Sequence, residues 1–196
     1  MAFVALVATG CQSSGSETRG DRRVQPEYDA TGRLKQLTYD RDGDGKIDTW
    51  GFMDGARVVR VEVDENGDGQ VDRWEYHTTG SQGAAGANGA DGATGAGANG
   101  VETTVERIDR STRHDGRVSR QEFFDHGVLT RVEEDTDGDG KIDKWETYTA
   151  GALAVLALDS KGRGTPDRRL IYEPDGTLGR IESDPNGTGT FQPISR

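Results

Sequence analysis

A twelve-residue pattern occurs three times in this chain, starting at Asp40, Asp64 and Asp135. Counted from that first aspartate, oxygen-bearing side chains fall at positions 3 and 5, glycine at 4 and 6, aspartate at 9 and tryptophan at 11. Asp64 follows Asp40 by 24 residues, and the same interval leads from Asp135 to a degenerate copy at Asp159. Two more degenerate copies start at Ser111 and Asp184. Such a fixed period predicts a repeat array rather than one large core.

The composition agrees with small, repeated cores. Only 31% of the 196 residues are hydrophobic and 29 are glycine. The 35 acidic side chains outnumber the 24 basic ones, which gives a net charge of -11. This charge argues against nucleic acid or an anionic membrane surface as a partner, and it favours cations.

The oxygen-bearing residues have the spacing of a calcium loop. Calcium takes six to eight oxygen ligands, and an EF-hand loop supplies them from positions 1, 3, 5, 7, 9 and 12, with glycine at position 6. Two loops match throughout. The predicted ligands of the first are Asp64, Asn66, Asp68, the carbonyl of Gln70, Asp72 and Glu75; those of the second are Asp135, Asp137, Asp139, the carbonyl of Lys141, Asp143 and Glu146.

The Asp40 loop matches only in part. It offers Asp40, Asp42, Asp44, the carbonyl of Lys46 and Asp48, but Gly51 stands where the bidentate glutamate is expected. We therefore expect weaker binding there. Cationic residues stand at ligand positions of the Ser111 and Asp159 copies, namely Arg113, Lys161 and Arg163, which predicts that these two copies bind no ion.

The alternative interpretation is that these segments are plain solvated turns, since aspartate and glycine are common turn residues. Agreement over twelve positions in two loops favours ion binding, because clustered carboxylates repel one another and a cation relieves that repulsion. Magnesium fits less well, since it prefers fewer protein ligands in octahedral geometry.

Between the loops, the sequence predicts one β-hairpin per repeat. Trp50 and Phe52 alternate with other residues, as do Val59, Val61 and Val63, and a glycine turn joins such runs. Apolar residues three apart, such as Leu34 and Leu37, also permit a helix. However, about 12 residues including a turn are marginal for one. The predicted fold is mainly β: an array of hairpins joined by calcium-binding loops.

A glycine-rich stretch interrupts the array. Residues 80–100 have glycine at every third position up to Gly95 but contain no proline, which argues against a collagen helix. We expect a disordered, flexible linker between an N-terminal repeat block, residues 25–79, and a C-terminal block, residues 101–196.

The N-terminus resembles a bacterial lipoprotein signal. A short apolar run leads to Ala8-Thr9-Gly10-Cys11, and Cys11 is the one cysteine in the chain. The resemblance implies cleavage before Cys11, lipidation of Cys11, a flexible tether over residues 12–24, and export to the cell envelope, at the outer membrane or surface.

The loops resemble the EF-hand-like repeats of dockerins and thrombospondin type 3 domains, whereas Glu27 to Leu34 resembles a YD repeat of the RHS family. A true EF-hand needs flanking helices, which the β-type pattern between loops does not provide. The leading hypothesis is a calcium-stabilised envelope lipoprotein with a structural or adhesive role, whose partner is an envelope or surface protein or a polysaccharide.

The alternative is a module that recognises a folded partner, either dockerin-like or RHS-related. An enzyme is not expected. The three histidines, His77, His114 and His126, do not recur at matching repeat positions, and no nucleophile or phosphate-loop motif is present in the sequence.

Overall fold

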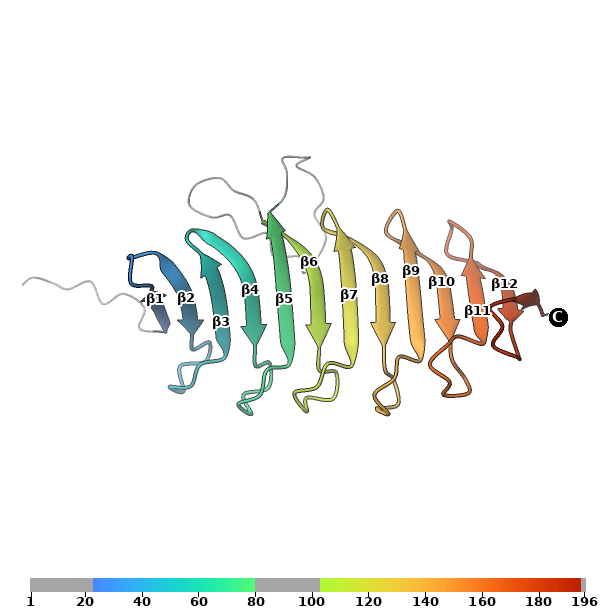
Figure 1. Cartoon of the computed structure of the whole chain (residues 1–196), viewed down its shortest axis with the longest axis horizontal. Helices are drawn as coiled ribbons and strands as arrows, with labels where there is room; N and C mark the ends of the chain where they lie inside the picture. Colours follow the sequence, from blue (N-terminus) through green and yellow to red (C-terminus); the bar gives the residue numbers. More distant parts are fainter. Residues whose placement is uncertain (1–22, 80–102, 195–196) are drawn as a thin grey trace, which may run out of the picture.

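The computed structural model describes residues 23–79 and 103–194, and these residues form strands, turns and loops without a helix. Thirteen strands make one antiparallel sheet, in which each strand pairs with its neighbours in sequence (Figure 1). The strands are β1 (Val24–Tyr28), β2 (Leu34–Tyr39), β3 (Thr49–Asp54), β4 (Arg57–Val63), β5 (Arg73–Thr79), β6 (Thr103–Arg110), β7 (Arg120–Asp125), β8 (Val128–Glu134), β9 (Lys144–Thr149), β10 (Ala152–Leu158), β11 (Arg168–Tyr172), β12 (Leu178–Ser183) and β13 (Gln192–Pro193). The predicted array of hairpins is confirmed.

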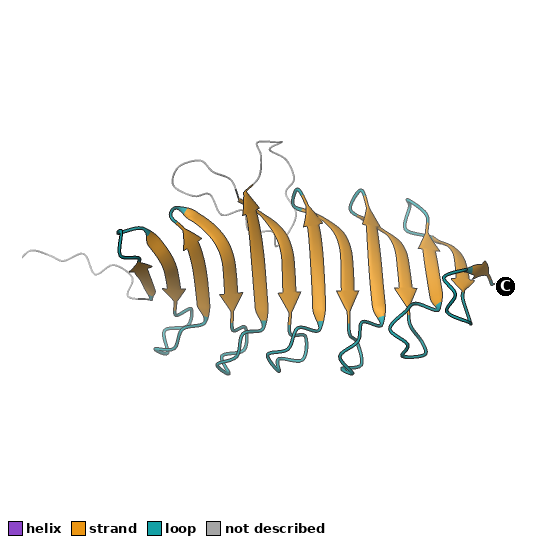
Figure 2. Cartoon of the chain, viewed as in Figure 1, coloured by secondary structure: helices purple, strands orange, loops and turns teal. Residues whose placement is uncertain are grey.

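The strands are joined by different connections at their two ends, and each row of connections forms one long edge of the sheet. The aspartate-rich loops all lie along one edge, whereas the short hairpin turns lie along the other (Figure 2). Two of these turns, His126-Gly127 and Ala150-Gly151, have positive φ at both residues. That conformation matches the twist of the flanking strands and is the usual one for two-residue hairpins.

A β-bulge in each hairpin explains the apolar residues that stand three apart. In β8, Leu129 pairs with Phe124 but Arg131 pairs with Phe123, so Thr130 is an extra residue in the strand. The same irregularity occurs in β2, β4, β6, β10 and β12. Because an extra residue shifts the alternation by one, Leu129 and Val132 reach the same face of the sheet. The helical alternative is therefore wrong.

The sheet is a single layer. Among the described residues only four apolar side chains are buried, Val63, Ile108, Val132 and Ala157. One face, here called the aromatic face, carries a cross-strand row in which rings and guanidinium groups alternate: Phe52, Arg60, Tyr76, Arg107, Phe123 and Arg131.

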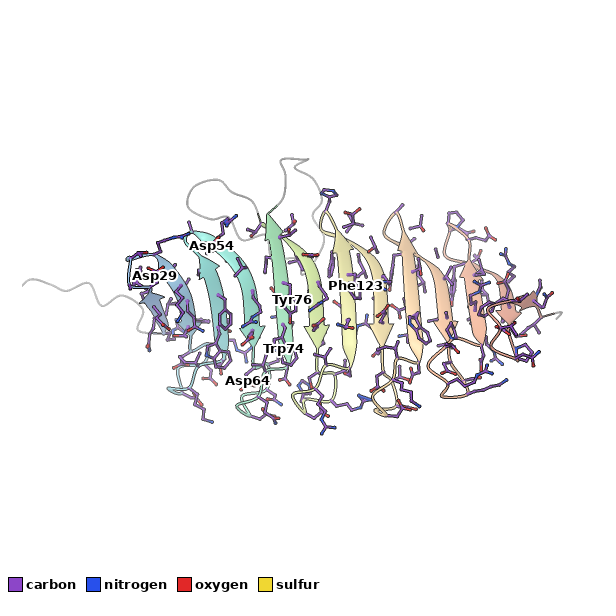
Figure 3. All side chains as sticks on the ribbon, viewed as in Figure 1. Asp29, Asp54, Asp64, Trp74, Tyr76 and Phe123 are labelled. Atoms are coloured by element: carbon purple, nitrogen blue, oxygen red, sulfur yellow. The ribbon has the colours of Figure 1, made fainter. Side chains whose placement is uncertain are left out.

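Stacking within this row replaces part of the missing core. The guanidinium carbon of Arg60 lies 4.1 Å from the Phe52 ring centroid. The corresponding distances are 4.2 Å for Arg107 over Tyr76 and 3.9 Å for Arg131 over Phe123. Figure 3 labels these two aromatic residues, Tyr76 on β5 and Phe123 on β7. Such cation–π contacts contribute about 0.5–1 kcal/mol each at partly exposed sites.

The two predicted repeat blocks belong to one sheet. Strands β5 and β6 pair directly, from Arg73 with Arg110 to Thr79 with Thr103. The segment between them therefore joins two hairpin partners, at the edge where other repeats have a short turn. The predicted linker, residues 80–100, lies outside the described residues.

The N-terminal predictions also fall largely outside the structure. Cys11, the signal and most of the predicted tether precede Arg23, the first described residue, whereas Val24 already belongs to β1. Glu27 to Leu34 spans the end of β1, a turn and the start of β2. In the turn, Asp29 Oδ1 accepts hydrogen bonds from the amides of Thr31 and Arg33. None of the described residues forms a helix that could cross a membrane.

Candidate calcium-binding loops

Each loop is closed by its own backbone at positions 1 and 9. The amide of Asp72, at position 9, donates to the carbonyl of Val63, the residue before position 1, at 2.8 Å. Asp48 and Asp143 make the same bond to Tyr39 and Glu134, at 3.0 Å each. The first and ninth residues are thereby held side by side at the sheet edge.

The position 1 carboxylate organises the turn. In the Asp64 loop, Oδ1 accepts the amide of Gly67 and Oδ2 accepts the amide of Gly69, both at 2.7 Å. Asp40 and Asp135 accept the corresponding glycine amides at 2.6–3.0 Å. The two glycines have φ of 77° and 90°, a region that other residues rarely adopt. This geometry explains glycine at both positions 4 and 6.

Positions 3 and 5 form successive tight turns. Asp137 Oδ1 accepts the amide of Asp139 at 3.0 Å, and Asp139 Oδ1 accepts the amide of Lys141 at 2.8 Å. The Asp40 and Asp64 loops repeat both bonds. The position 7 residues, predicted to ligate through their carbonyls, thus use their amides to orient the position 5 carboxylates.

The structure brings three predicted ligands together in two loops. Carboxylate oxygens of Asp40, Asp42 and Asp48 lie within 4.8 Å of one another, as do those of Asp135, Asp137 and Asp143. The matching residues of the third loop are Asp64, Asn66 and Asp72. Three carboxylates at this separation repel one another, so a cation between them would stabilise the loop.

Asp72 gives the sharpest test of whether an ion fits. It is only 1% exposed, and its Oδ1 has no hydrogen-bond partner among the described residues. Its Oδ2 accepts the Glu65 amide at 3.1 Å and lies 3.1 Å from His114 Nδ1. A buried carboxylate oxygen without a partner is costly, and a hard cation is the group that such an oxygen binds best.

Hydrogen bonds keep a position 1 carboxylate ionised. Burial by itself would raise the pKa of Asp135. The amides of Gly138 and Gly140, together with the nearby Arg113 guanidinium, nevertheless hold that pKa below its ordinary value. The loop therefore presents a charged oxygen donor at neutral pH.

The predicted position 12 ligands lie elsewhere, in the sheet. Glu146 in β9 contacts Lys144 Nζ at 2.7 Å and accepts the Tyr148 hydroxyl at 2.7 Å, whereas Glu75 in β5 pairs with Arg73. A helix after the loop would advance about 3 Å over two residues, but a strand advances about 7 Å. The strand thus carries each glutamate away from the loop, and neither belongs to a three-carboxylate group.

The degenerate copies keep the same loop geometry. Asp159 and Asp184 are buried at position 1 and accept the position 6 amides of Gly164 and Gly189 at 2.5 and 2.6 Å. Asp167, at position 9, is also buried. Positions 1 and 9 therefore shape the loop whether or not an ion binds, a double role that the ligand pattern alone does not reveal.

One comparison with known proteins bears on these loops. A family model described as EF hand matches residues 135–147, which span the Asp135 loop and the start of β9. This match supports calcium-binding loop character for that segment. No curated protein and no solved structure matches the chain.

Proposed function

We propose that this protein is a non-enzymatic calcium-binding repeat protein of the cell envelope, anchored through a lipidated Cys11, with a structural or adhesive role. The observation that supports calcium most directly is the buried Asp72 oxygen without a partner, placed beside Asp64. In a single-layer sheet with four buried apolar side chains among the described residues, ion binding would add stability that a core supplies elsewhere.

Thermodynamic linkage between ion binding and folding gives the size of this stabilisation. A site filled at ten times its dissociation constant adds about 1.4 kcal/mol to the free energy of unfolding. Two or three such sites along one edge would add a large part of the stability of a small domain. Calcium in this proposal is structural, and the partner is an envelope or surface protein or a polysaccharide.

Isothermal titration and thermal unfolding test the calcium proposal. We expect binding in the range of extracellular modules, about 10⁻⁴ to 10⁻³ M, because the loops lack paired helices. The unfolding temperature should rise with calcium and much less with equal magnesium. A chain that binds no calcium at about 10 mM, tenfold above the weaker limit, would defeat the proposal and leave plain turns.

Mass spectrometry of the native protein tests the anchor. A mature N-terminus at a diacylated Cys11 is the expected result, motivated by Ala8-Thr9-Gly10-Cys11. Recovery of an intact Met1 with an unmodified thiol from the membrane fraction would refute it.

A recognition module is the second candidate, and the aromatic face favours it. Tyr76, Phe123, Glu106 and Arg107 line a groove of about 190 Å³ on this face. Stoichiometric capture of a folded envelope protein, abolished by Phe123→Ala but retained in Val128→Ala, would support this role. Capture unaffected by Phe123→Ala would exclude the groove as the binding surface.

A further inference from the structure

The degenerate Ser111 loop lies between the two most complete loops. The amide of Ser111 donates to the carbonyl of Asp72 at 2.7 Å, and the amide of Asp135 donates to the carbonyl of Ser119 at 2.8 Å. Serines replace both aspartates, at positions 1 and 9, and hydrogen bonds of their hydroxyl groups replace those that the carboxylates make in the other loops. The hydroxyls of Thr112 and Ser119, for example, are 2.6 Å apart. This loop needs no ion, yet it touches both neighbours.

Arg113 extends from this loop onto the Asp135 loop. Its Nη2 donates to the carbonyl of Asp135 at 3.1 Å and lies 3.4 Å from Asp135 Oδ1. It also packs on the backbone of Gly138, where an added Cβ would stand 2.7 Å from Nη2. The guanidinium therefore rests against a carboxylate of the Asp135, Asp137 and Asp143 group.

Arg113 differs from two other cationic side chains that reach the following loop. Arg41 Nη2 donates to the carbonyl of Glu65 at 3.2 Å, and Lys161 Nζ donates to the carbonyl of Pro185 at 2.8 Å. These cations bind the main chain of the following loop. Arg113 also contacts a position 1 carboxylate, which is a predicted ion ligand.

We propose that Arg113 sets the calcium affinity of the Asp135 loop by acting as a built-in competing cation. This inference rests on the proposed calcium binding and concerns how that site is tuned. The fixed guanidinium charge partly neutralises the carboxylate group when no ion is bound, and it repels a divalent ion that enters. Arg113 therefore stabilises the ion-free loop and weakens calcium binding to it.

Calcium titration of the full chain tests the proposal. Arg113→Met keeps an unbranched apolar stem but removes the guanidinium charge, so it should strengthen binding at one site about twofold to fivefold. Arg113→Lys should stay close to the parent. Lys161→Met is the matched control, because it removes a positive charge from a contact with a carbonyl in a copy predicted to bind no ion, and it should leave all affinities unchanged. The gain in calcium affinity should vanish when Arg113→Met is combined with Asp137→Asn. That result would assign the gain to the Asp135 loop.

Thermal unfolding gives a second readout, which a merely structural arginine would not produce. Arg113→Met should lower the unfolding temperature in chelator but raise or retain it in saturating calcium, whereas loss of packing would lower both. Unchanged or weaker calcium binding in Arg113→Met would overturn this inference while leaving the proposed function intact. A parent chain that binds no calcium would instead overturn both.

Discussion

The main-chain carbonyl of Asp48 accepts a 2.8 Å hydrogen bond from the amide of Asp64. The last predicted side-chain ligand of the Asp40 loop is thus tied to the first predicted ligand of the Asp64 loop. The same bond joins Asp143 to Asp159 and Asp167 to Asp184. Neighbouring loops are therefore in direct contact along the edge, so an ion that ordered one loop would help to order the next.

Two carboxylates of one repeat should respond differently to neutralisation. Asp137 belongs to a three-carboxylate group, so Asp137→Asn should weaken calcium binding at one site by about tenfold or more. Glu146 is paired with Lys144 and Tyr148 in the sheet. Glu146→Gln should therefore cost about 1–2 kcal/mol of stability, equally with and without calcium. Calorimetric titration and denaturant unfolding of both variants measure these effects.

The opposite pattern would restore the ligand set predicted from the sequence. If Glu146→Gln abolished one calcium site, the glutamate would have to leave Lys144 and reach the loop when the ion binds.

Residues 80–102 should be replaceable by a two-residue Asn-Gly turn. Thr79 and Thr103 are already paired, so the short turn closes an existing hairpin. Shortening a 23-residue connection to two residues reduces the loop-closure entropy, which should raise stability by up to about 2 kcal/mol. Calorimetry should show one cooperative transition. Loss of that transition would mean that the segment contributes to the fold.

Two valines of β8 form a matched pair for core packing. Val132 is fully buried, whereas Val128 is 45% exposed. Val132→Ala should cost about 1–3 kcal/mol through lost burial and the cavity left behind, and Val128→Ala less than about 0.5 kcal/mol. Urea unfolding compares them directly. Equal costs would show that the single layer has no packed centre at Val132.

The phenol of Tyr148 should make stability fall at alkaline pH. Burial, reinforced by the bond to Glu146, raises the pKa of Tyr148 from 10.0 to about 12. Since the folded pKa lies above the unfolded one, the stabilisation is complete below pH 10 and is lost as pH rises towards 12. Tyr148→Phe should remove this part of the decline between about pH 10 and 12, measured by urea midpoints. Tyr28→Phe, at an exposed position on the first strand, should follow the parent.

The hairpin array could be predicted from the sequence because it depends on local patterns. The 24-residue period, the glycine turns and the alternation of Trp50 and Phe52 all act within one repeat. The Leu34 and Leu37 spacing remained ambiguous, because a bulge and a helix both place residues three apart on one face. Only the pairing of Tyr28 with Leu34 and Glu27 with Gln36 resolves it.

The clustering of the side chains at positions 1, 3 and 9 could be predicted from the sequence, whereas the places of the predicted ligands at positions 5 and 12, outside the three-carboxylate groups, could not. Residues within a tight turn are brought together by the turn itself, as Asp135, Asp137 and Asp143 are. The place of Glu146 depends on the element after the loop, a strand rather than a helix, and its pairing with Lys144 is a property of the sheet. The contact between Arg113 and Asp135 joins residues 22 apart, which requires knowing that adjacent loops stack.

The serial order of the strands sets how the molecule responds to force. Strands β1 and β13 are the two ends of the sheet, and each pairs with a single neighbour (Figure 1). Hydrogen bonds between antiparallel strands run perpendicular to the strands, along the long axis of this sheet. A pull that separates the two ends therefore loads these bonds along their own direction and peels strands away one at a time, so the chain lengthens in small steps rather than rupturing as a block.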